Sequence, residues 1–372
     1  MIAEVDGLNL GQGICDMPVP DAIKEATHAA VDADRSIYSP YNGVASLRAA
    51  IADKMASYNG IDVQDDEVVV SVGSTGAFVV AVLATLNPGD EIILFEPFYG
   101  YHRNLLMAMG VHPRYVRLSG PGWRVDPDLV RRAITPSTRA ILINTPGNPS
   151  GKVWSEQELL LVMEIMEEYD LRAITDEVYE YMLYDGRRHV SLATLPDAFE
   201  RTITLCSFSK TYNMTGWRLG YAVASRPVAE KMGLLNDLFY ICAPTPLQHG
   251  VLAGLQLGEE YLRRMRSAYS EKRALLCDTL RQCGFDAPYP EGAYYAFVSF
   301  ERLSKTRSGF GDCDEACQTI IREARVGSVA GTSFFSEAED GHFFLRFCFA
   351  KEMPALRQAC DQLLTAFGSQ PD

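Results

Sequence analysis

The sequence lacks the positive charge that a nucleic-acid or membrane-surface partner requires. Its 372 residues include 34 Lys and Arg against 48 Asp and Glu, so the formal net charge is −14. Proteins that bind DNA or RNA backbones present a basic footprint, and anionic lipid surfaces attract polybasic segments. The composition therefore argues against both partners. It leaves anionic small molecules open, because a few placed arginines can bind those locally.

The sequence also lacks the marks of export, membrane insertion and metal binding. None of the nine cysteines forms a C-x-x-C pair, and no second Cys/His pair complements Cys313 and Cys317 as a zinc site. The six histidines form no recognisable ligand set, so we expect packing or surface roles for most of them. The chain begins without the basic and apolar segments of a signal peptide, and no apolar run reaches the roughly 18 residues of a membrane span. We expect a cytoplasmic protein with free thiols and no bound metal.

Apolar runs alternate with amphipathic stretches through the middle of the chain. Helices are predicted at 76–86, 100–109, 126–134 and 155–169, and strands at 67–72, 91–95, 140–144, 171–175, 202–206 and 219–224. This alternation predicts an α/β fold with a mostly parallel central sheet and helices on both faces. No G-x-G-x-x-G follows the first strand, which disfavours a nicotinamide-dependent dehydrogenase.

The last hundred residues change character. A long charged helix is predicted at 259–283, a second helix at 314–324, and isolated strands at 293–299 and 343–349. This pattern indicates a smaller α+β domain. We place a large domain at 34–262 and a small domain at 1–33 and 263–372, so that both chain ends build the small domain.

Polar and aromatic side chains follow the predicted strands, where open α/β sheets bind their ligands. Ser74 and Thr75 come after the first strand and before a helix, an arrangement that suits a phosphate but also an ordinary turn. Tyr99 follows the second strand and can stack on a planar ring, as many core aromatics can. Asn148 projects from a Pro- and Gly-rich loop, and Asp176 ends a strand where a carboxylate needs a cationic partner.

A lysine follows the strand at 202–206. Lys210 is preceded by Ser207 and followed by Arg218. Desolvation and a neighbouring cation lower the pKa of a lysine, which favours imine formation. These side chains together require one ligand with a phosphate, a flat ring, a ring cation and an aldehyde. That ligand is pyridoxal 5′-phosphate, for which a lysine and an acidic partner of the ring nitrogen are the expected protein groups.

Three ordered segments resemble the fold-type-I, class I/II aminotransferases. They are NTPGNPSG at 144–151, DEVY at 176–179 and SFSKTYNMTGWRLGY at 207–221, the last of which matches the family's cofactor-lysine segment. The resemblance extends from LGQG at 10–13 to LRF at 345–347. It implies a pyridoxal-phosphate-dependent enzyme that is a homodimer with shared active sites.

The resemblance also implies a role for each matching residue. Lys210 is the expected Schiff-base lysine and proton carrier, and Asp176 the partner of the ring nitrogen. Tyr179 and Asn148 are expected to donate hydrogen bonds to the phenolic oxygen, and Tyr99 to stack on the ring. Ser74, Thr75, Ser207 and Arg218 are expected to bind the phosphate. Arg346 would clamp the substrate α-carboxylate, Gly13 would allow the substrate to approach closely, and Tyr38, with Tyr41 as its competitor, would contact the partner subunit's phosphate.

The chain departs from the family's pattern at two places. The segment before residue 10 is shorter than usual, which leaves the contribution of an N-terminal arm to the dimer open. Residues 14–17, Ile-Cys-Asp-Met, replace a commoner Pro-Asp-Phe sequence at the substrate entrance. The segment FYICAPTPLQ at 239–248 resembles the branch that handles kynurenine, methionine, glutamine and aromatic substrates.

The leading functional hypothesis is ping-pong transamination between an L-amino acid and a 2-oxo acid. Elimination, cyclisation, oxidation or a lyase-type reaction remains the alternative, because all of these begin at the same Cα carbanion. A non-enzymatic effector-binding module, which usually comes fused to a DNA-binding domain, is disfavoured by the net charge of −14. The identity of the substrates stays open.

Overall fold

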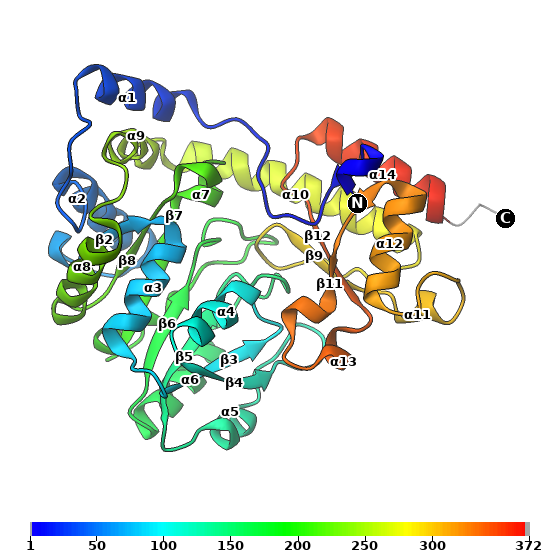
Figure 1. Cartoon of the computed structure of the whole chain (residues 1–372), viewed down its shortest axis with the longest axis horizontal. Coiled ribbons are helices and arrows are strands. Elements are labelled where there is room, and N and C mark those ends of the chain that lie inside the picture. The colour runs from blue at the N-terminus through cyan, green and yellow to red at the C-terminus, as the bar shows by residue number, and fades with distance from the viewer. Residues whose placement is uncertain (1, 369–372) are drawn as a thin grey trace.

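The computed structural model describes residues 2–368, which contain a large sheet, a small sheet and a separate pair of two-residue strands (Figure 1). The large sheet has seven strands in the order β2-β8-β7-β6-β5-β3-β4. Its strands are β2 (Val68–Val72), β3 (Glu91–Glu96), β4 (His112–Arg117), β5 (Thr138–Asn144), β6 (Arg172–Asp176), β7 (Thr202–Ser207) and β8 (Leu219–Val223). All pairings are parallel except those of β8, which runs antiparallel to both β2 and β7. The predicted mostly parallel α/β sheet is confirmed.

Helices cover both faces of this sheet, as predicted. Successive side chains of a strand point to opposite faces, so Ile92 and Leu94 of β3 pack in a different core cluster from Ile93 and Phe95. One face packs against α3, α4 and α8, and the other against α5 and α6. These helices are α3 (Gly73–Thr85), α4 (Gly100–Ala108), α5 (Pro127–Ala133), α6 (Glu156–Glu168) and α8 (Arg226–Tyr240).

Side-chain caps fix the starts of two helices where the sequence predicts them. The Asp126 carboxylate accepts hydrogen bonds from the backbone N–H groups of residues 128 and 129 at the start of α5. Ser155 and Glu158 form a reciprocal capping box at the start of α6. The prediction for α3 was three residues late, since this helix begins at Gly73. Its first turn, rather than a preceding loop, therefore carries Ser74 and Thr75.

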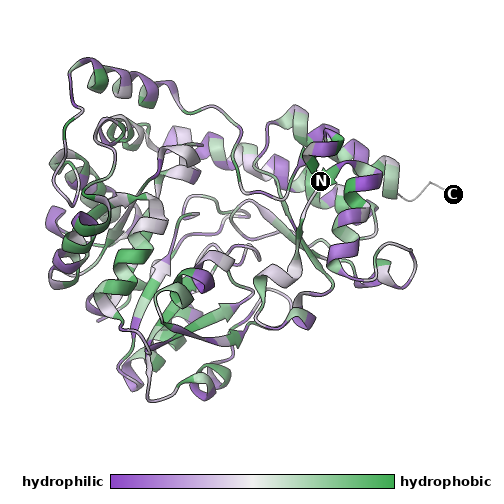
Figure 2. Ribbon diagram, in the orientation of Figure 1, coloured by the Kyte–Doolittle hydropathy of each residue, from purple (hydrophilic) through white to green (hydrophobic). Residues whose placement is uncertain are grey.

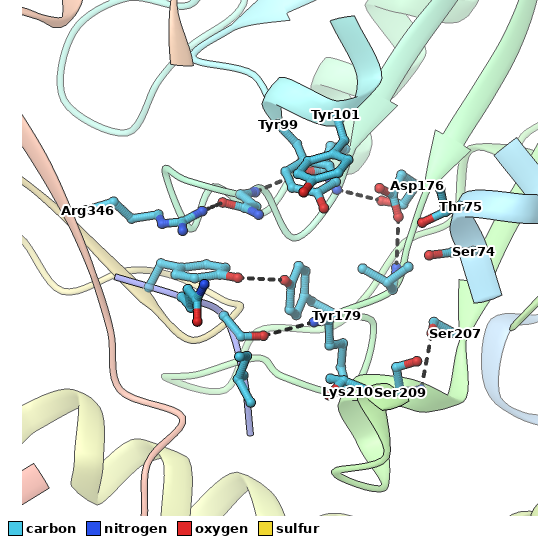
Figure 3. A pocket seen from close by; sticks show the side chains of 18 of the residues that line it. Ser74, Thr75, Tyr99, Tyr101, Asp176, Tyr179, Ser207, Ser209, Lys210 and Arg346 are labelled. Carbon is cyan, nitrogen blue, oxygen red and sulfur yellow. Dashed lines mark hydrogen bonds between the residues drawn. The ribbon is translucent and has the colours of Figure 1, made fainter. Parts of the chain in front are cut away.

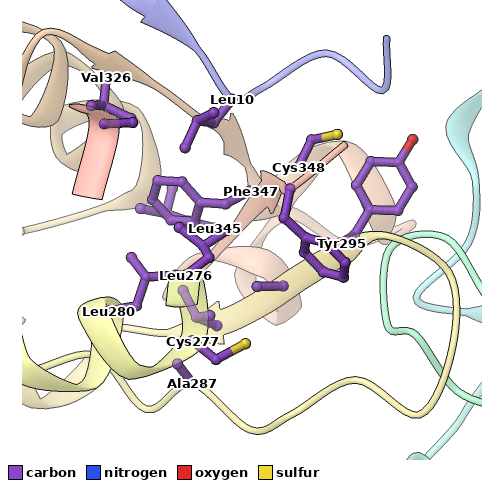
Figure 4. Close-up of a cluster of buried hydrophobic side chains, with 14 of the residues drawn as sticks. Leu10, Leu276, Cys277, Leu280, Ala287, Tyr295, Val326, Leu345, Phe347 and Cys348 are labelled. Carbon is purple, nitrogen blue, oxygen red and sulfur yellow. The ribbon is translucent and has the colours of Figure 1, made fainter. Parts of the chain in front are cut away.

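The small sheet is antiparallel and has the order β11-β12-β9. Its strands are β9 (Tyr295–Ser299), β11 (Val329–Ala330) and β12 (Phe344–Cys348), and it packs with α10 (Gly258–Gln282), α12 (Cys313–Ala324) and α14 (Met353–Phe367). Figure 4 shows Leu276 and Leu280 of α10 directed at Leu345 and Phe347 of β12. In Figure 2, outer helices such as α1 (Asp21–Asp32) carry both purple and green residues, as a helix with one buried face requires, whereas α3 is mostly green. The predicted α+β character of this region is confirmed.

The amino-terminal segment is divided between the two parts of the molecule. A two-residue strand that the sequence did not predict, β1 (Leu8–Asn9), pairs in parallel with β10 (Val326–Gly327) beside the small sheet. Helix α1 (Asp21–Asp32) instead packs against α9 (Thr245–Leu255) and shares a core with α2 (Ala45–Lys54) on the large-sheet side (Figure 1). The domain boundaries at 33/34 and 262/263 stay a proposal, and α10 runs unbroken across the second of them.

Short elements complete the described chain. They are the helices α7 (Phe208–Thr211), α11 (Glu301–Ser304) and α13 (Ala338–Gly341) and the 3-10 turns at Ile2–Val5, Asp65–Glu67, Leu192–Thr194, Phe199–Arg201, Thr215–Trp217 and Gly331–Phe334, with one π turn at Met55–Asn59. Across residues 2–368, we find no helix that combines the length and the apolar character needed to span a membrane. The same residues contain no cluster of three or more His, Cys, Asp or Glu that could hold a metal ion.

Candidate active site

A cavity of about 440 Å³ lies at the carboxyl ends of the parallel strands, between the large sheet and the small domain. This volume is typical of a small-molecule site. Figure 3 shows side chains from both parts of the molecule directed into the cavity. Eleven of the twelve predicted site residues line it, namely Gly13, Ser74, Thr75, Tyr99, Asn148, Asp176, Tyr179, Ser207, Lys210, Arg218 and Arg346. Their roles remain proposals, but the structure brings them together.

The reversed strand β8 explains why one end of the cavity is rich in anion-binding groups. Because β8 begins where β2 and β7 end, Arg218, which precedes β8, reaches the same edge as Ser74 and Ser207. Strand β8 passes close to the first turn of α3. A Cβ at Gly220 would lie 2.4 Å from the Ser74 nitrogen, so only glycine fits at this position of β8.

The guanidinium of Arg218 lies against the first residue of α3. A Cβ at Gly73 would be 2.4 Å from Nη2 of Arg218, and the φ of Gly73 is +71°. Arg218 itself has a left-handed backbone, with φ 55°, which is uncommon for a residue with a side chain. Ser74 and Thr75 sit in the first turn of α3, where free N–H groups and the helix dipole favour an anion.

Lys210 lies at the opposite side of the cavity from Tyr99 and Tyr101 (Figure 3). Its Nζ donates a hydrogen bond to the carbonyl oxygen of Gly13 at 3.2 Å and lies 5.5 Å from the ring centre of Tyr294. Burial lowers the pKa of Lys210, and the charge of Arg218 lowers it further. The amine is therefore neutral, and nucleophilic, at a lower pH than an exposed lysine.

Asp176 ends β6 and is held by a histidine that sequence analysis assigned to packing or the surface. Nε2 of His102 lies 2.9 Å from Oδ2 of Asp176, and both side chains are buried. The backbone N–H of Val178 donates to the other carboxylate oxygen at 3.4 Å. His102 also meets the ring of Tyr99 edge-on at 5.2 Å. The available sequence signal was its spacing, since His102 lies three residues after Tyr99 and therefore on the same side of α4.

Arg346 of β12 is clamped between two aromatic rings. Its Cζ lies 4.3 Å from the ring centre of Tyr295 and 5.0 Å from that of Phe334. Nη1 donates to Oδ1 of Asn148 at 2.8 Å, and Nη2 donates to the carbonyl oxygen of Gly11 at 2.7 Å. The buried Nε has no hydrogen-bond partner. The guanidinium is thus fixed in orientation by neutral groups, and its charge is available to an anion in the cavity.

Tyr295 of β9 is a cavity residue that sequence analysis missed. The Tyr179 hydroxyl donates to the Tyr295 hydroxyl at 3.2 Å. A Cβ at Gly13 would lie only 1.9 Å from the same Tyr295 oxygen. Gly13 is therefore required because the Tyr295 hydroxyl occupies the space of a side chain. No local pattern distinguishes Tyr295 from its buried neighbour Tyr294, and only the packing of β9 against residues 10–13 shows its position.

Tyr38 is the one predicted residue that lies outside the cavity. Its side chain is 77% exposed, as is that of Ile37. Tyr41, the competing candidate, packs its ring against Gly233 of α8 instead, because a Cβ there would lie 2.5 Å from a Tyr41 ring carbon. The structure thus leaves Tyr38 free to reach another molecule, and its predicted contact with a partner subunit stays a prediction.

The residues at the cavity fit the ligand that the sequence implies. Hydroxyls, a helix N-terminus and Arg218 suit a phosphate at one end, and Arg346 suits a carboxylate at the other. Ser209 Oγ and Arg346 Nε are buried polar atoms without partners, and both residues line the cavity. Ser209 was not among the predicted phosphate ligands, although the Ser-x-Ser-Lys spacing places it beside Ser207.

Comparison with known proteins shows the family of the chain. The model of the family described as aminotransferase class I and II matches residues 5–363. The chain belongs to the class I and II aminotransferases. Members of this family use pyridoxal phosphate, and the family assignment makes the chain an enzyme rather than an effector-binding module.

The relatives of this aminotransferase cover nearly its whole length. Aromatic-amino-acid aminotransferase 2 of Thermococcus litoralis is 32% identical over 96% of this chain and 90% of that protein. Human kynurenine–oxoglutarate transaminase 1 is 31% identical over 98% and 93% of the two chains. The solved structure of N-succinyldiaminopimelate aminotransferase from Mycobacterium tuberculosis superposes with a TM-score of 0.93 at 32% identity, covering 98% of this chain and 94% of that chain. The predicted fold-type-I architecture is confirmed.

Proposed function

We propose that this aminotransferase moves an amino group between an L-amino acid and a 2-oxo acid with pyridoxal phosphate in the 440 Å³ cavity. The observation that carries the proposal is the position of Lys210, whose lowered pKa suits bonding to an aldehyde, in the same cavity as Asp176 and Arg346. Bound pyridoxal phosphate supplies a ring that withdraws electrons from the substrate Cα.

The protein's own groups perform the remaining tasks. Arg346 orients the substrate through its α-carboxylate, and the rings of Tyr295 and Phe334 hold the guanidinium in place. Nζ of Lys210 would accept the proton from the substrate Cα and later return it, as a general base and then a general acid. Asp176 keeps a proton on the ring nitrogen.

Residues at one end of the cavity would hold the cofactor through its phosphate. Ser74, Thr75, Ser207 and Arg218 supply hydroxyl, N–H and guanidinium donors to one anion. We assign Tyr179 and Asn148 to the phenolic oxygen and Tyr99 to the ring face. Because the phosphate remains bound between the two half-reactions, the enzyme can accept an amino acid and then a 2-oxo acid in turn.

Replacement of Lys210 tests the proposal. The wild-type holoenzyme should show a visible absorption band that an amino acid alone bleaches, with pyridoxamine phosphate as the product. Lys210→Ala should lose the band and nearly all activity. Lys272→Ala is a matched control, because burial also lowers the pKa of Lys272, which packs against Met17.

Three results would reject or change the assignment. An active Lys210→Ala enzyme, or borohydride reduction that labels another lysine, would refute it. Bleaching that yields ammonia or a cyclised product without pyridoxamine phosphate would favour the elimination or cyclisation alternative. A half-transamination panel would then identify the substrate, which the differing names of the relatives do not.

An exposed apolar surface supports a homodimer. Ile37 and Tyr38 are each 77% exposed, and Leu238 at the end of α8 is 76% exposed. The two segments adjoin, since Asn236 of α8 donates to the Tyr41 carbonyl oxygen at 2.6 Å. Large apolar side chains exposed to this degree mark protein interfaces when they lie together. We propose that a second copy covers this surface and that each Tyr38 reaches the partner's phosphate site.

One charged residue placed on the proposed dimer surface tests the dimer. Leu238→Asp should convert the protein to monomers in analytical ultracentrifugation, and Tyr38→Phe should weaken retention of the cofactor without dissociating the dimer. A Leu238→Asp protein that remains dimeric would refute the proposed surface.

The nine cysteines are all free, which supports a reducing compartment such as the cytoplasm.

A further inference from the structure

Tyr295 contacts both the proposed carboxylate site and the proposed cofactor site. The face of its ring lies 4.3 Å from Cζ of Arg346, and its hydroxyl accepts a hydrogen bond from the Tyr179 hydroxyl at 3.2 Å. The Tyr295 side chain is 2% exposed, so it cannot leave this position without disturbing both neighbours. One buried side chain thus connects the group assigned to the substrate carboxylate with the group assigned to the phenolic oxygen.

Two acceptors compete for the single proton of the Tyr179 hydroxyl, namely the Tyr295 hydroxyl and the phenolic oxygen of the cofactor. A phenol donates one hydrogen bond, and in the structure Tyr179 donates it to Tyr295. The same proton is the one that Tyr179 would offer to the phenolic oxygen of the cofactor. The stronger Tyr295 is as an acceptor, the weaker the hydrogen bond that the phenolic oxygen receives.

The charge of Arg346 sets the strength of that acceptor. The hydrogen-bond acceptors of Arg346 are neutral, namely the Asn148 amide and the Gly11 carbonyl oxygen. Its positive charge therefore acts on the Tyr295 ring without compensation. A nearby cation makes a phenol a better donor and a poorer acceptor. A carboxylate bound to Arg346 neutralises this charge, so Tyr295 then draws the Tyr179 proton more strongly.

We propose that Tyr295 is a positioning residue that transmits the occupancy of Arg346 to the hydrogen bond between Tyr179 and the cofactor's phenolic oxygen. This inference rests on the proposed function. Carboxylate binding at Arg346 would weaken the hydrogen bond that Tyr179 offers to the phenolic oxygen. The visible band of the holoenzyme should therefore titrate at a higher pH when the carboxylate is bound.

Other groups near Tyr295 enter the same balance. Burial raises the pKa of Tyr295 to about 12, and the charge of Arg346 and the hydrogen bonds with Tyr179 and Tyr294 lower it in part, whereas Cys348 adds to the rise. Tyr295 therefore stays protonated over the pH range in which the enzyme would be assayed. The transmitted signal is a change in hydrogen-bond direction and strength, not ionisation of the tyrosine. The Arg346–Asn148 hydrogen bond provides a second connection, so removal of Tyr295 should reduce the effect rather than abolish it.

The experiment titrates the visible band of the holoenzyme against pH with and without a carboxylate that lacks an amino group. The probes are propanoate, 4-methylpentanoate and 3-phenylpropanoate. In the wild type, a bound carboxylate should raise the pH midpoint of the band. In Tyr295→Phe, which keeps the ring over Arg346, the carboxylate Kd should stay within about threefold, and the rise should fall to about half or less. Tyr295→Leu, which removes the ring, should also weaken carboxylate binding by about tenfold.

Two further variants separate transmission from structural damage. Tyr179→Phe should reduce the rise as Tyr295→Phe does, and the double variant should lose little more, because both hydroxyls belong to one connection. Tyr184→Phe removes a buried hydroxyl that donates to the Ala293 carbonyl oxygen at 2.6 Å, and it should behave as wild type. It controls for the loss of a buried hydrogen bond close to β9.

The outcomes distinguish this inference from the proposed function. A full carboxylate-induced rise in Tyr295→Phe, or an equal loss in Tyr184→Phe, would overturn the role of Tyr295. A wild-type band that does not move while the carboxylate inhibits competitively would also overturn it and leave the proposed function intact. A wild-type protein without a visible band would overturn the proposed function as well.

Discussion

Gly13→Ala would test how closely the amino-terminal segment fits the cavity. The added Cβ would lie 1.9 Å from the Tyr295 hydroxyl oxygen and 2.9 Å from Cζ of the same ring, whereas ordinary contacts begin at 3.4 Å. One of the two residues must therefore move by about 1.5 Å. Tyr295 is fixed by Arg346 and Tyr179, and the carbonyl oxygen of Gly13 is fixed by hydrogen bonds from Lys210 at 3.2 Å and Tyr294 at 3.0 Å.

The expected cost follows from this geometry. Overpacking a well-filled site costs about 1–3 kcal/mol, which we expect as the loss in free energy of unfolding measured in urea. A misplacement of about 1 Å at reacting groups can lower the rate by about 10²-fold, which we expect in the single-turnover rate of the amino acid half-reaction. Gly327→Ala is the control, because its Cβ would meet nothing closer than 3.4 Å.

A double variant makes the prediction specific to the clash. In Gly13→Ala/Tyr295→Phe, the nearest atom to the new Cβ becomes the ring carbon at 2.9 Å, so part of the lost stability should return. If Gly13→Ala is as stable and as fast as the wild type, or if the second substitution makes the stability loss larger, the assigned contact is wrong.

Three other perturbations have directions set by the structure. Arg346→Lys keeps the charge but loses the planar fork held between two rings, so KM for the amino acid should rise about 10- to 100-fold in steady-state assays; an unchanged KM would contradict the clamp. Glu177 is fully buried, accepts hydrogen bonds at one oxygen from Thr175 and Ser191 at 2.8 Å each, and lies with the other oxygen 2.5 Å from Nε2 of His189. Glu177→Gln removes the acceptor that faces His189, so it should lower the free energy of unfolding by about 1–3 kcal/mol, which urea denaturation can measure against Glu164→Gln as an exposed control. Because burial lowers the pKa of Lys210, the rate at which the apoenzyme captures pyridoxal phosphate should rise with pH and level off below the ordinary lysine value of 10.5; a plateau reached only above that pH would refute the burial argument.

The features predicted correctly from the sequence are those that depend on residues close together in the chain, such as strand ends and helix caps. The ends of the buried strands could be located from their apolar runs, and the polar residues that follow them had to meet at one edge of a parallel sheet. The sequence alone therefore predicts that Ser74, Asp176 and Lys210 lie together. The capping residues of α5 and α6 were predicted for the same reason, since a cap acts within one turn.

The features that sequence analysis missed depend on contacts between distant segments. Strand β4 is an edge strand of alternating exposed and partly buried residues, so it has no apolar run to mark it. The antiparallel direction of β8 depends on its two neighbours, not on its own residues. His102 and Tyr295 belong to the site because α4 and β9 place them there, and neither has a motif of its own.

The attachment of the amino-terminal segment to β12 has a consequence for synthesis on the ribosome. Cys348 donates its backbone N–H to the Leu10 carbonyl oxygen at 2.6 Å, and Arg346 donates to the Gly11 carbonyl oxygen from 335 residues further along. At roughly 5–20 residues per second, this separation corresponds to a delay of about 20–70 s. The nascent chain therefore exposes the large sheet and Lys210 long before Gly13 is held in place. The residues assigned to the phosphate therefore leave the ribosome before Arg346, and the proposed carboxylate site is completed last, when β12 pairs with β9.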